Sequence, residues 1–151
     1  GDFPMRDMHH NIEPKVALSP ESAFTDDGTY VGPIIDRLGY WSVEFLIQCG
    51  KLLDAGATFT PSLEAGDVAS LSDAAAVGAS ELLGTIALAT FTEADDYLVK
   101  KLGYIGKKRY LRLTMTPSGN TAEAFVSALC VLGHGGDKPS GATPTANAVP
   151  A

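Results

Sequence analysis

The stretch WSVEFLIQ, Trp41–Gln48, shows the clearest alternation of apolar and polar residues in the chain. Successive side chains of a β-strand point to opposite faces, so a strand over this stretch directs four apolar residues to one side: Trp41, Val43, Phe45 and Ile47. The opposite side is polar except at Leu46, which interrupts it. The pattern predicts a strand with one face in a core and the other in water, with Trp41 buried and Leu46 at a contact.

Other parts of the chain repeat this period of two. Thr58–Ala65 and Ala124–Leu132 alternate in the same way, and Leu111, Leu113 and Met115 form an apolar face on the segment between them. Turn-forming Gly, Pro and Asp residues separate these segments. Three further stretches are compatible with strands: Ile12–Leu18, Tyr30–Asp36 and Thr85–Phe91.

Many short strands with little helix predict an all-β fold, a β-sandwich or jelly-roll-like domain with extended termini. Asp67–Leu83 is rich in Ala and Ser and predicts a short helix or a long crossing loop. A length of 151 residues is typical of a single domain. We expect an N-terminal arm over residues 1–11, the sandwich over residues 12–133, and a flexible or extended C-terminal tail over residues 134–151. Pro14 cannot donate to a ladder, which places its strand at an edge or makes it a strand start.

The composition narrows the classes of partner. The formal net charge is −7 and the pI is about 4.8. Nucleic-acid binding requires a dominant positive field, so we expect no nucleic-acid partner. The N-terminal residues lack the apolar region of a signal peptide, and no apolar run approaches the about 20 residues of a membrane span, so we expect no membrane association. Cys49 and Cys130 lie in apolar runs and are predicted to be buried thiols.

Positive charge is concentrated in Gly103–Leu113, which contains four of the eleven Lys and Arg residues: Lys107, Lys108, Arg109 and Arg112. Gly103 and Gly106 do not match a phosphate-binding loop and predict a hairpin turn. Nucleic-acid contact is one interpretation of the charges, which the overall acidity disfavours, and two others remain open. They protect an edge strand against aggregation, or they contact an acidic protein surface, where Arg binds carboxylates in a bidentate manner.

The sequence contains no recognisable catalytic or metal-binding arrangement. The acidic clusters Asp26-Asp27 and Glu93–Asp96 lack the spacing of a calcium loop and are typical of solvated turns. His9 and His10 are adjacent and point to opposite faces of an extended chain, and His134 lies far from them, so we interpret all three as surface or interface residues. We expect a non-enzymatic protein with no metal and no cofactor.

The stretch KLGYIGKKRYLR, Lys101–Arg112, resembles a pattern in small proteins encoded within structural gene clusters of tailed phages and prophages. Other pieces match in order along the chain: Met5-Arg6-Asp7, Ile34-Ile35-Asp36 followed by Gly39-Tyr40 and Ser42–Ile47, Phe59–Glu64, Leu82-Leu83-Gly84 and Val131–His134. The resemblance covers Met5–His134 and includes no catalytic motif.

The resemblance implies a virion structural protein. From the size, the acidity and the arm-like termini we expect a decoration or cement protein on the bacteriophage capsid surface, made in the host cytoplasm. Its partners would be the major capsid protein, contacted through Lys107, Lys108, Arg109 and Arg112, and neighbouring copies of itself. Decoration proteins are commonly trimers, which makes a homotrimer the working assumption. A tail or head-tail connector component and a carbohydrate-binding module on a virion are the alternatives, and the expected burial of Trp41 argues against the last.

Overall fold

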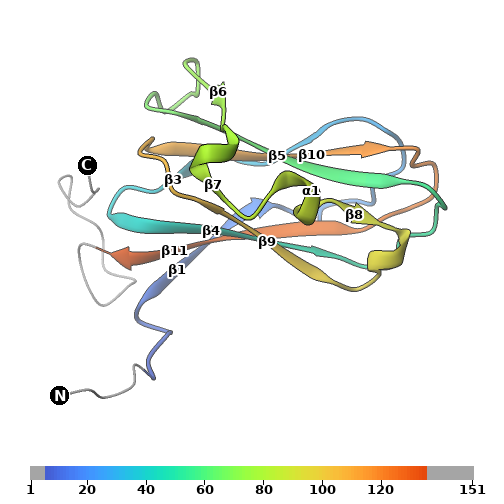
Figure 1. Cartoon of the computed structure of the whole chain (residues 1–151), viewed down its shortest axis with the longest axis horizontal. Coiled ribbons are helices and arrows are strands. Elements are labelled where there is room, and N and C mark those ends of the chain that lie inside the picture. Colours follow the sequence, from blue (N-terminus) through green and yellow to red (C-terminus); the bar gives the residue numbers. More distant parts are fainter. Residues whose placement is uncertain (1–5, 136–151) are drawn as a thin grey trace.

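The structure is a computed structural model that describes residues 6–135 of the chain. Within these residues the chain folds into two antiparallel β-sheets packed face to face (Figure 1). The five-stranded sheet has the strand order β1 (Ile12–Leu18), β11 (Val126–Gly135), β4 (Tyr40–Cys49), β9 (Val99–Tyr104) and β7 (Leu82–Leu83). The predicted all-β sandwich is confirmed.

The second sheet has six strands, most of them short. Its main path runs through β2 (Tyr30–Val31), β10 (Tyr110–Ser118), β5 (Thr58–Gly66) and β6 (Ala75–Ala76). In addition, β3 (Ile35–Asp36) pairs with β10, and β8 (Phe91–Thr92) pairs with β5. Helical structure in the described part is limited to α1 (Ile86–Ala89) and two 3-10 turns, η1 (Ala79–Glu81) and η2 (Glu93–Asp95).

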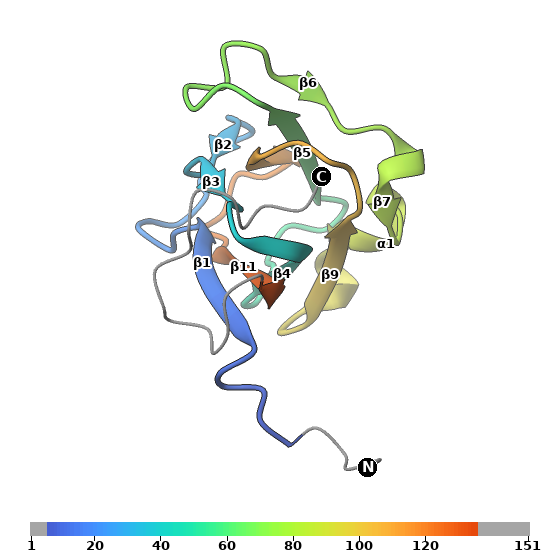
Figure 2. The same ribbon diagram turned by 90° about the vertical axis from the view of Figure 1, so that its left-hand side faces the viewer.

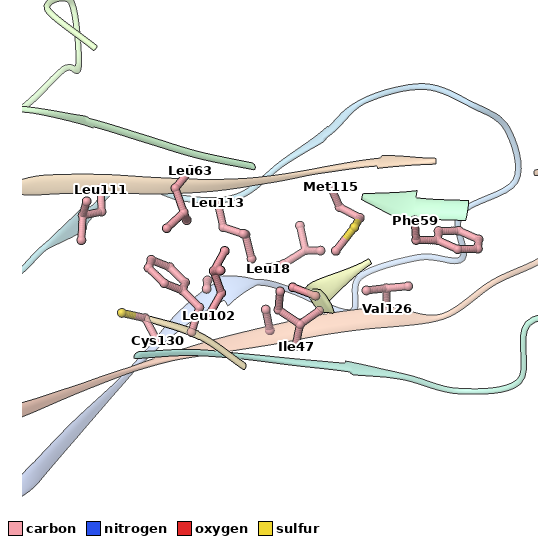
Figure 3. Close-up of a cluster of buried hydrophobic side chains, with 14 of the residues drawn as sticks. Leu18, Ile47, Phe59, Leu63, Leu102, Leu111, Leu113, Met115, Val126 and Cys130 are labelled. Carbon is pink, nitrogen blue, oxygen red and sulfur yellow. The ribbon is translucent and has the colours of Figure 1, made fainter. Parts of the chain in front are cut away.

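The hydrophobic core lies between the two sheets, where the alternating strands direct their apolar sides (Figure 3). The predicted inward residues of β10, Leu111, Leu113 and Met115, are all fully buried. They face side chains of the other sheet such as Ile47 and Leu102. The alternation in β5 and β11 therefore identified the core residues correctly, because each strand has only one face in the core. In β4 it did so from Val43 to the end of the strand.

The first and last strands lie side by side, with β1 at the edge of its sheet and β11 next to it. The edge position of the strand that contains Pro14 is confirmed. Residues 6–10 lead away from the sandwich in both views, whereas Asn11 lies against it next to β1 (Figures 1 and 2). The last strand continues to Gly135, two residues beyond the predicted domain boundary, and the remainder of the predicted tail lies outside the described residues.

Two of the expected strands have a different structure. Thr85–Phe91 was expected to be a strand, but Ile86–Ala89 form the short helix α1, because the Thr85 side chain accepts a hydrogen bond from the Leu88 amide and caps the turn. Tyr30–Asp36 was also expected to be a strand and is broken into β2 and β3 around Gly32 and Pro33. The Gly32 amide donates to the Leu113 carbonyl, so the chain passes close to β10 at the break.

The segment Asp67–Leu83 is the long crossing loop of the two predicted alternatives. It leaves β5, contributes β6 to one sheet, forms η1 and joins the other sheet as β7. The Asp73 carboxylate accepts hydrogen bonds from the amides of Asp67 and Val68 and fixes the start of this loop. The loop therefore bridges the two sheets along one side of the sandwich.

The segment after β9 is not a hairpin turn, because β9 and β10 belong to different sheets. Gly103 and Gly106 allow close packing in this segment. A Cβ at Gly106 would overlap the Tyr104 ring, and a Cβ at Gly103 would lie too close to the Leu83 side chain. Moreover, β10 is not an edge strand, since β5 pairs with it on one side and β2 and β3 on the other. The interpretation of its charges as edge protection is therefore wrong.

Both cysteines are buried free thiols, as predicted. They lie on adjacent strands, but Cys49 pairs with Val126 and Cys130 with Phe45. This offset of four residues separates the thiols by about 13 Å along the strand, beyond the reach of a disulfide. Burial raises the pKa of the Cys130 thiol to about 12, so it is protonated and unreactive at neutral pH.

Candidate interaction surface

The basic segment predicted to contact a partner is held by carboxylates of the same chain. The Arg109 guanidinium forms a bidentate pair with Asp36, with both N–O distances 2.9 Å. The Lys108 ammonium lies 2.9 Å from the Asp67 carboxylate, which also accepts a hydrogen bond from the Arg109 amide. These pairs join the segment to β3 and to the end of β5, and they offset part of its positive field.

Arg112 is also paired within the chain. It lies directly across from Glu64 in the register of β10 and β5, and the two side chains form an ion pair. Lys107 is exposed, and among the described residues it has no carboxylate partner. Three of the four basic residues thus pair with carboxylates of the second sheet or of the loop that follows β5. The role of all four as capsid contacts stays a prediction.

Two buried residues organise this segment: Arg37, which the sequence did not single out, and Tyr104, which was expected to be exposed and is buried. Arg37 is buried, its Nε donates to the Lys108 carbonyl at 2.7 Å, and its guanidinium lies 5.6 Å from the Tyr104 ring centre. The Tyr104 hydroxyl accepts a hydrogen bond from the Lys108 amide. Burial lowers the pKa of Arg37 and raises that of Tyr104. No local pattern reveals such a cluster, because Arg37 and Lys108 are 71 residues apart.

The pair between Arg109 and Asp36 predicts a small, pH-dependent coupling. Burial raises the pKa of Asp36, but hydrogen bonds from Arg109 and from the Leu38 amide outweigh burial, so this pKa lies below its usual value. The pair is half exposed, and a double-mutant cycle with R109A and D36A should give a coupling of about 0.2 to 1 kcal/mol at pH 7. Because the folded-state pKa is depressed, the coupling should persist above the unfolded-state value near 3.8 and vanish as the pH falls through the folded-state value.

Urea unfolding of the four proteins at pH 7 and at a series of acidic pH values that continues below the folded-state pKa of Asp36 measures this coupling. A coupling that stayed constant across that pH range would show that the two side chains do not interact as an ion pair.

The outer surfaces of the two sheets differ in chemistry. On the second sheet, Thr and Ser residues face each other across β5 and β10: Thr58 and Ser118, Thr60 and Thr116, Ser62 and Thr114. On the five-stranded sheet, Val16, Leu129 and Leu46 lie in one row across β1, β11 and β4. Val131 and Leu83 continue this surface, which we call the apolar face.

The apolar face is exposed in the isolated chain. Val16 is 51% exposed, Leu129 47% and Leu83 53%. The sequence flagged only Leu46 as a contact, because the row appears once the register places the three strands together. Glu44 lies beside this row, where burial raises the pKa of its carboxyl and the charge of Lys101 lowers it in part. The face therefore has one partly desolvated carboxylate and a continuous apolar row.

The apolar face ends in a groove of about 550 Å³ that is lined by residues from the start of β4 and the end of β11. These two strand ends lie at the left in Figure 1. Trp41 was expected to be buried and is instead 59% exposed in the wall of this groove. The alternation breaks down at the start of β4, where Tyr40 is buried and Trp41 is exposed. The remaining lining includes Ile12, Glu44, Leu83, Ile105, Val131 and His134.

The acidic clusters have structural roles. Asp95 caps η2 together with Thr92, and the Asp96 carboxylate accepts a hydrogen bond from the Leu52 amide. Asp26 and Asp27 accept hydrogen bonds from the amides of Gly28 and Asn120. Within residues 6–135 no group of three or more His, Cys, Asp or Glu side chains could hold a metal ion. The helices in the same range are all too short to cross a membrane.

No family model and no curated protein matches the sequence. Among solved structures, one of the infectious bursal disease virus Gx strain is similar over 85% of this chain and 33% of that chain, with 15% identity and a TM-score of 0.48. The crystal structure of the infectious bursal disease virus VP2 subviral particle covers the same shares, with 13% identity and a TM-score of 0.36. The chain thus spans about a third of the length of these structures. At such identities and TM-scores, the likeness indicates no common function.

Proposed function

We propose that the protein is a non-enzymatic structural component of a phage virion that decorates the capsid surface. The observation that carries this proposal is the contrast between the two outer surfaces: three Thr and Ser pairs and an ion pair across β5 and β10 on one, and the apolar face on the other. An exposed apolar row is typical of an interaction site, whereas a polar sheet surface is stable in water. The molecule would attach through the five-stranded sheet and present the second sheet to solvent.

The ordered pattern shared with phage structural proteins supports a virion partner. The major capsid protein and neighbouring copies of the chain are the partners that a decoration role requires, and a homotrimer is the arrangement we propose. Apolar burial contributes about 25 cal/mol per Å² of surface removed from water, so the apolar face supplies the attachment energy. Lys107, which is exposed and follows β9 of the attaching sheet, adds charge complementarity, which acts on the rate of association and its salt dependence.

The decisive experiment compares matched Asp substitutions on the two outer surfaces. L129D places a carboxylate in the middle of the apolar face, and burying it unpaired is costly. We expect its affinity for purified heads to fall at least about tenfold, a change of about 1.4 kcal/mol in binding free energy, which lowers its occupancy at subsaturating concentration. T116D is the control, because Thr116 is exposed on the second sheet. Occupancy is measured from the stoichiometry of the protein on intact heads and by imaging the particles.

Three outcomes would contradict the proposal. Equal occupancy of L129D and T116D would remove the apolar face as the attachment surface. Binding that depends on salt and on Lys107, Lys108, Arg109 and Arg112, but not on Leu129, would make the basic segment the contact instead. Absence of the protein from heads and its presence on tails or connectors would assign it to those structures.

A carbohydrate-binding module is the second candidate, and the exposure of Trp41 in a groove favours it. An indole ring offers a flat apolar surface with an N–H donor, and sugars stack on such surfaces. Ser42, Glu44 and His134 supply polar groups in the same groove. Glycan binding by the isolated protein that is lost in W41A would favour this function over capsid decoration.

A further inference from the structure

The groove that contains Trp41, which we call the Trp41 groove, holds a carboxylate without a described partner. Glu44 lies opposite Gly103 in the register of β4 and β9. A Cβ at Gly103 would lie 2.9 Å from the Glu44 Oε1 atom, so the carboxyl group occupies the space that the glycine leaves open. Lys101 acts on this group through its charge, but within residues 6–135 the carboxylate accepts no hydrogen bond and forms no ion pair. The groove therefore presents an unpaired negative charge.

The walls around this carboxylate are largely apolar. Trp41, Leu83 and Ile105 line the groove, and all three are more than half exposed. An exposed indole among aliphatic side chains is a site where a partner can bury a large apolar group. Because the carboxylate is already partly removed from water, a cation that enters with that group offsets its desolvation. The groove thus fits a segment with one cation and one large apolar side chain.

Residues 6–10 of the N-terminal arm carry this combination. Arg6 is exposed, and its guanidinium forms no ion pair with another described residue. The Asp7 carboxylate is engaged by His10 instead, through the backbone amide at 3.0 Å and the ring Nδ1 at 2.7 Å. Met8 is 69% exposed, and its thioether is suited to contact with an aromatic ring. The arm therefore has an unpaired cation and an unburied apolar side chain on one short segment.

The arm starts at the groove but points away from the groove of its own chain. Asn11 and Ile12 line the groove, so the arm leaves the sandwich at this place. The Asn11 amide donates to the Met8 carbonyl at 2.9 Å and closes a turn, and residues 6–10 lead away from the sandwich in both views (Figures 1 and 2). Returning Met8 to the groove of the same chain would break this turn. A second copy beside the groove meets the arm without such a cost.

We propose that residues 6–10 of one copy occupy the Trp41 groove of a second copy. Arg6 of the arm pairs with Glu44, and Met8 packs on the indole. Because arm and groove adjoin on every copy, the contact repeats by symmetry, reciprocally in a dimer or from each copy to the next in a closed ring. The proposal deepens the proposed function and rests on its self-association, for which it names the contact. Attachment to heads uses the apolar face and is a separate contact.

Charge reversal tests the pair of Arg6 and Glu44 in the isolated full chain. R6E and E44R should each weaken self-association at least about tenfold in sedimentation equilibrium, because each variant brings like charges together in the contact. The double variant R6E/E44R should recover most of the lost affinity, since opposite charges meet again. E93R is the control, because Glu93 is exposed on η2, does not line the groove, and changes the net charge as E44R does.

Trp41 fluorescence shows whether the groove is the place of contact. Trp41 is the only tryptophan of the chain, so its emission reports on the groove alone. Occupancy by a second copy follows mass action, so raising the protein concentration should shift the emission to the blue and reduce acrylamide quenching at least about twofold. M8S should keep the quenching of the dilute protein at every concentration, with an unchanged circular dichroism spectrum because Met8 is exposed.

Three results would overturn the proposal. The chain could remain monomeric up to its solubility limit, or it could associate equally well as wild type, R6E and E44R, which would place the contact elsewhere. Failure of R6E/E44R to regain affinity would show that the two side chains do not meet. None of these results bears on attachment to heads, which L129D and T116D test separately.

Discussion

Replacing Phe45 with alanine is expected to lower the free energy of unfolding by about 3 to 5 kcal/mol, the range for large aromatic truncations in a core. Phe45 is fully buried at the centre of β4, and its register neighbours are Cys130 on β11 and Leu102 on β9. Packing between two sheets cannot relax easily around a lost ring, because both backbones are held by their ladders. Urea unfolding measures this change. The expected loss is a large part of the free energy of unfolding of a typical domain, which is about 5 to 15 kcal/mol.

The adjacent residue provides the control for Phe45. Leu46 lies on the outer side of the same strand and is only half-buried, so L46A should cost about 1 kcal/mol or less. Equal costs for F45A and L46A would mean that the two faces of β4 are buried to the same extent, which would contradict the sandwich.

Replacing Gly32 with alanine is expected to destabilise the protein by about 3 kcal/mol, which lowers Tm by about 10 °C in a domain of this size. Gly32 lies where the chain passes between β1 of one sheet and β10 of the other. A Cβ there would overlap the carbonyl oxygen of Ala17 and lie 3.0 Å from that of Leu113. Both obstacles are backbone atoms of paired strands, so the strain cannot be relieved by rotating a side chain.

Gly78 is the matched control for this substitution. No atom lies within 4 Å of a Cβ built at Gly78, and its φ of −77° is accessible to every residue. G78A should therefore leave Tm unchanged or raise it slightly, because alanine restricts the unfolded chain more than glycine does. A thermal melt of G32A that matched that of G78A would show that β1 and β10 do not approach each other as closely as the structure has them.

Much of the fold was predictable because four long strands have one face in the core. In β4, β5, β10 and β11, alternation identified inward residues such as Phe45, Leu63, Leu113 and Val126. The same rule failed at Trp41, since alternation tells which side a residue is on but not where the core ends. A separate prediction, a strand over the apolar stretch Thr85–Phe91, was wrong for Ile86–Ala89, where the capping hydrogen bond of Thr85 favoured a helix.

The candidate surface was predictable only in part. The charges of Lys108, Arg109 and Arg112 were visible in the sequence, but their carboxylate partners were not, because the paired residues are 41 to 73 positions apart. Leu46 was visible as an interruption of a polar face, while its row with Leu129 and Val16 depends on the register of three strands.

The amino-acid pattern by itself determined that the chain forms short antiparallel strands with a buried side, since a period of two is a local property of each segment. Only the tertiary structure decided that the basic segment is tied to Asp36 and Asp67, that Trp41 stands exposed in a groove, and that the apolar face is continuous. These features depend on which distant segments become neighbours, and that choice is made by the packing of the whole core rather than by any single stretch.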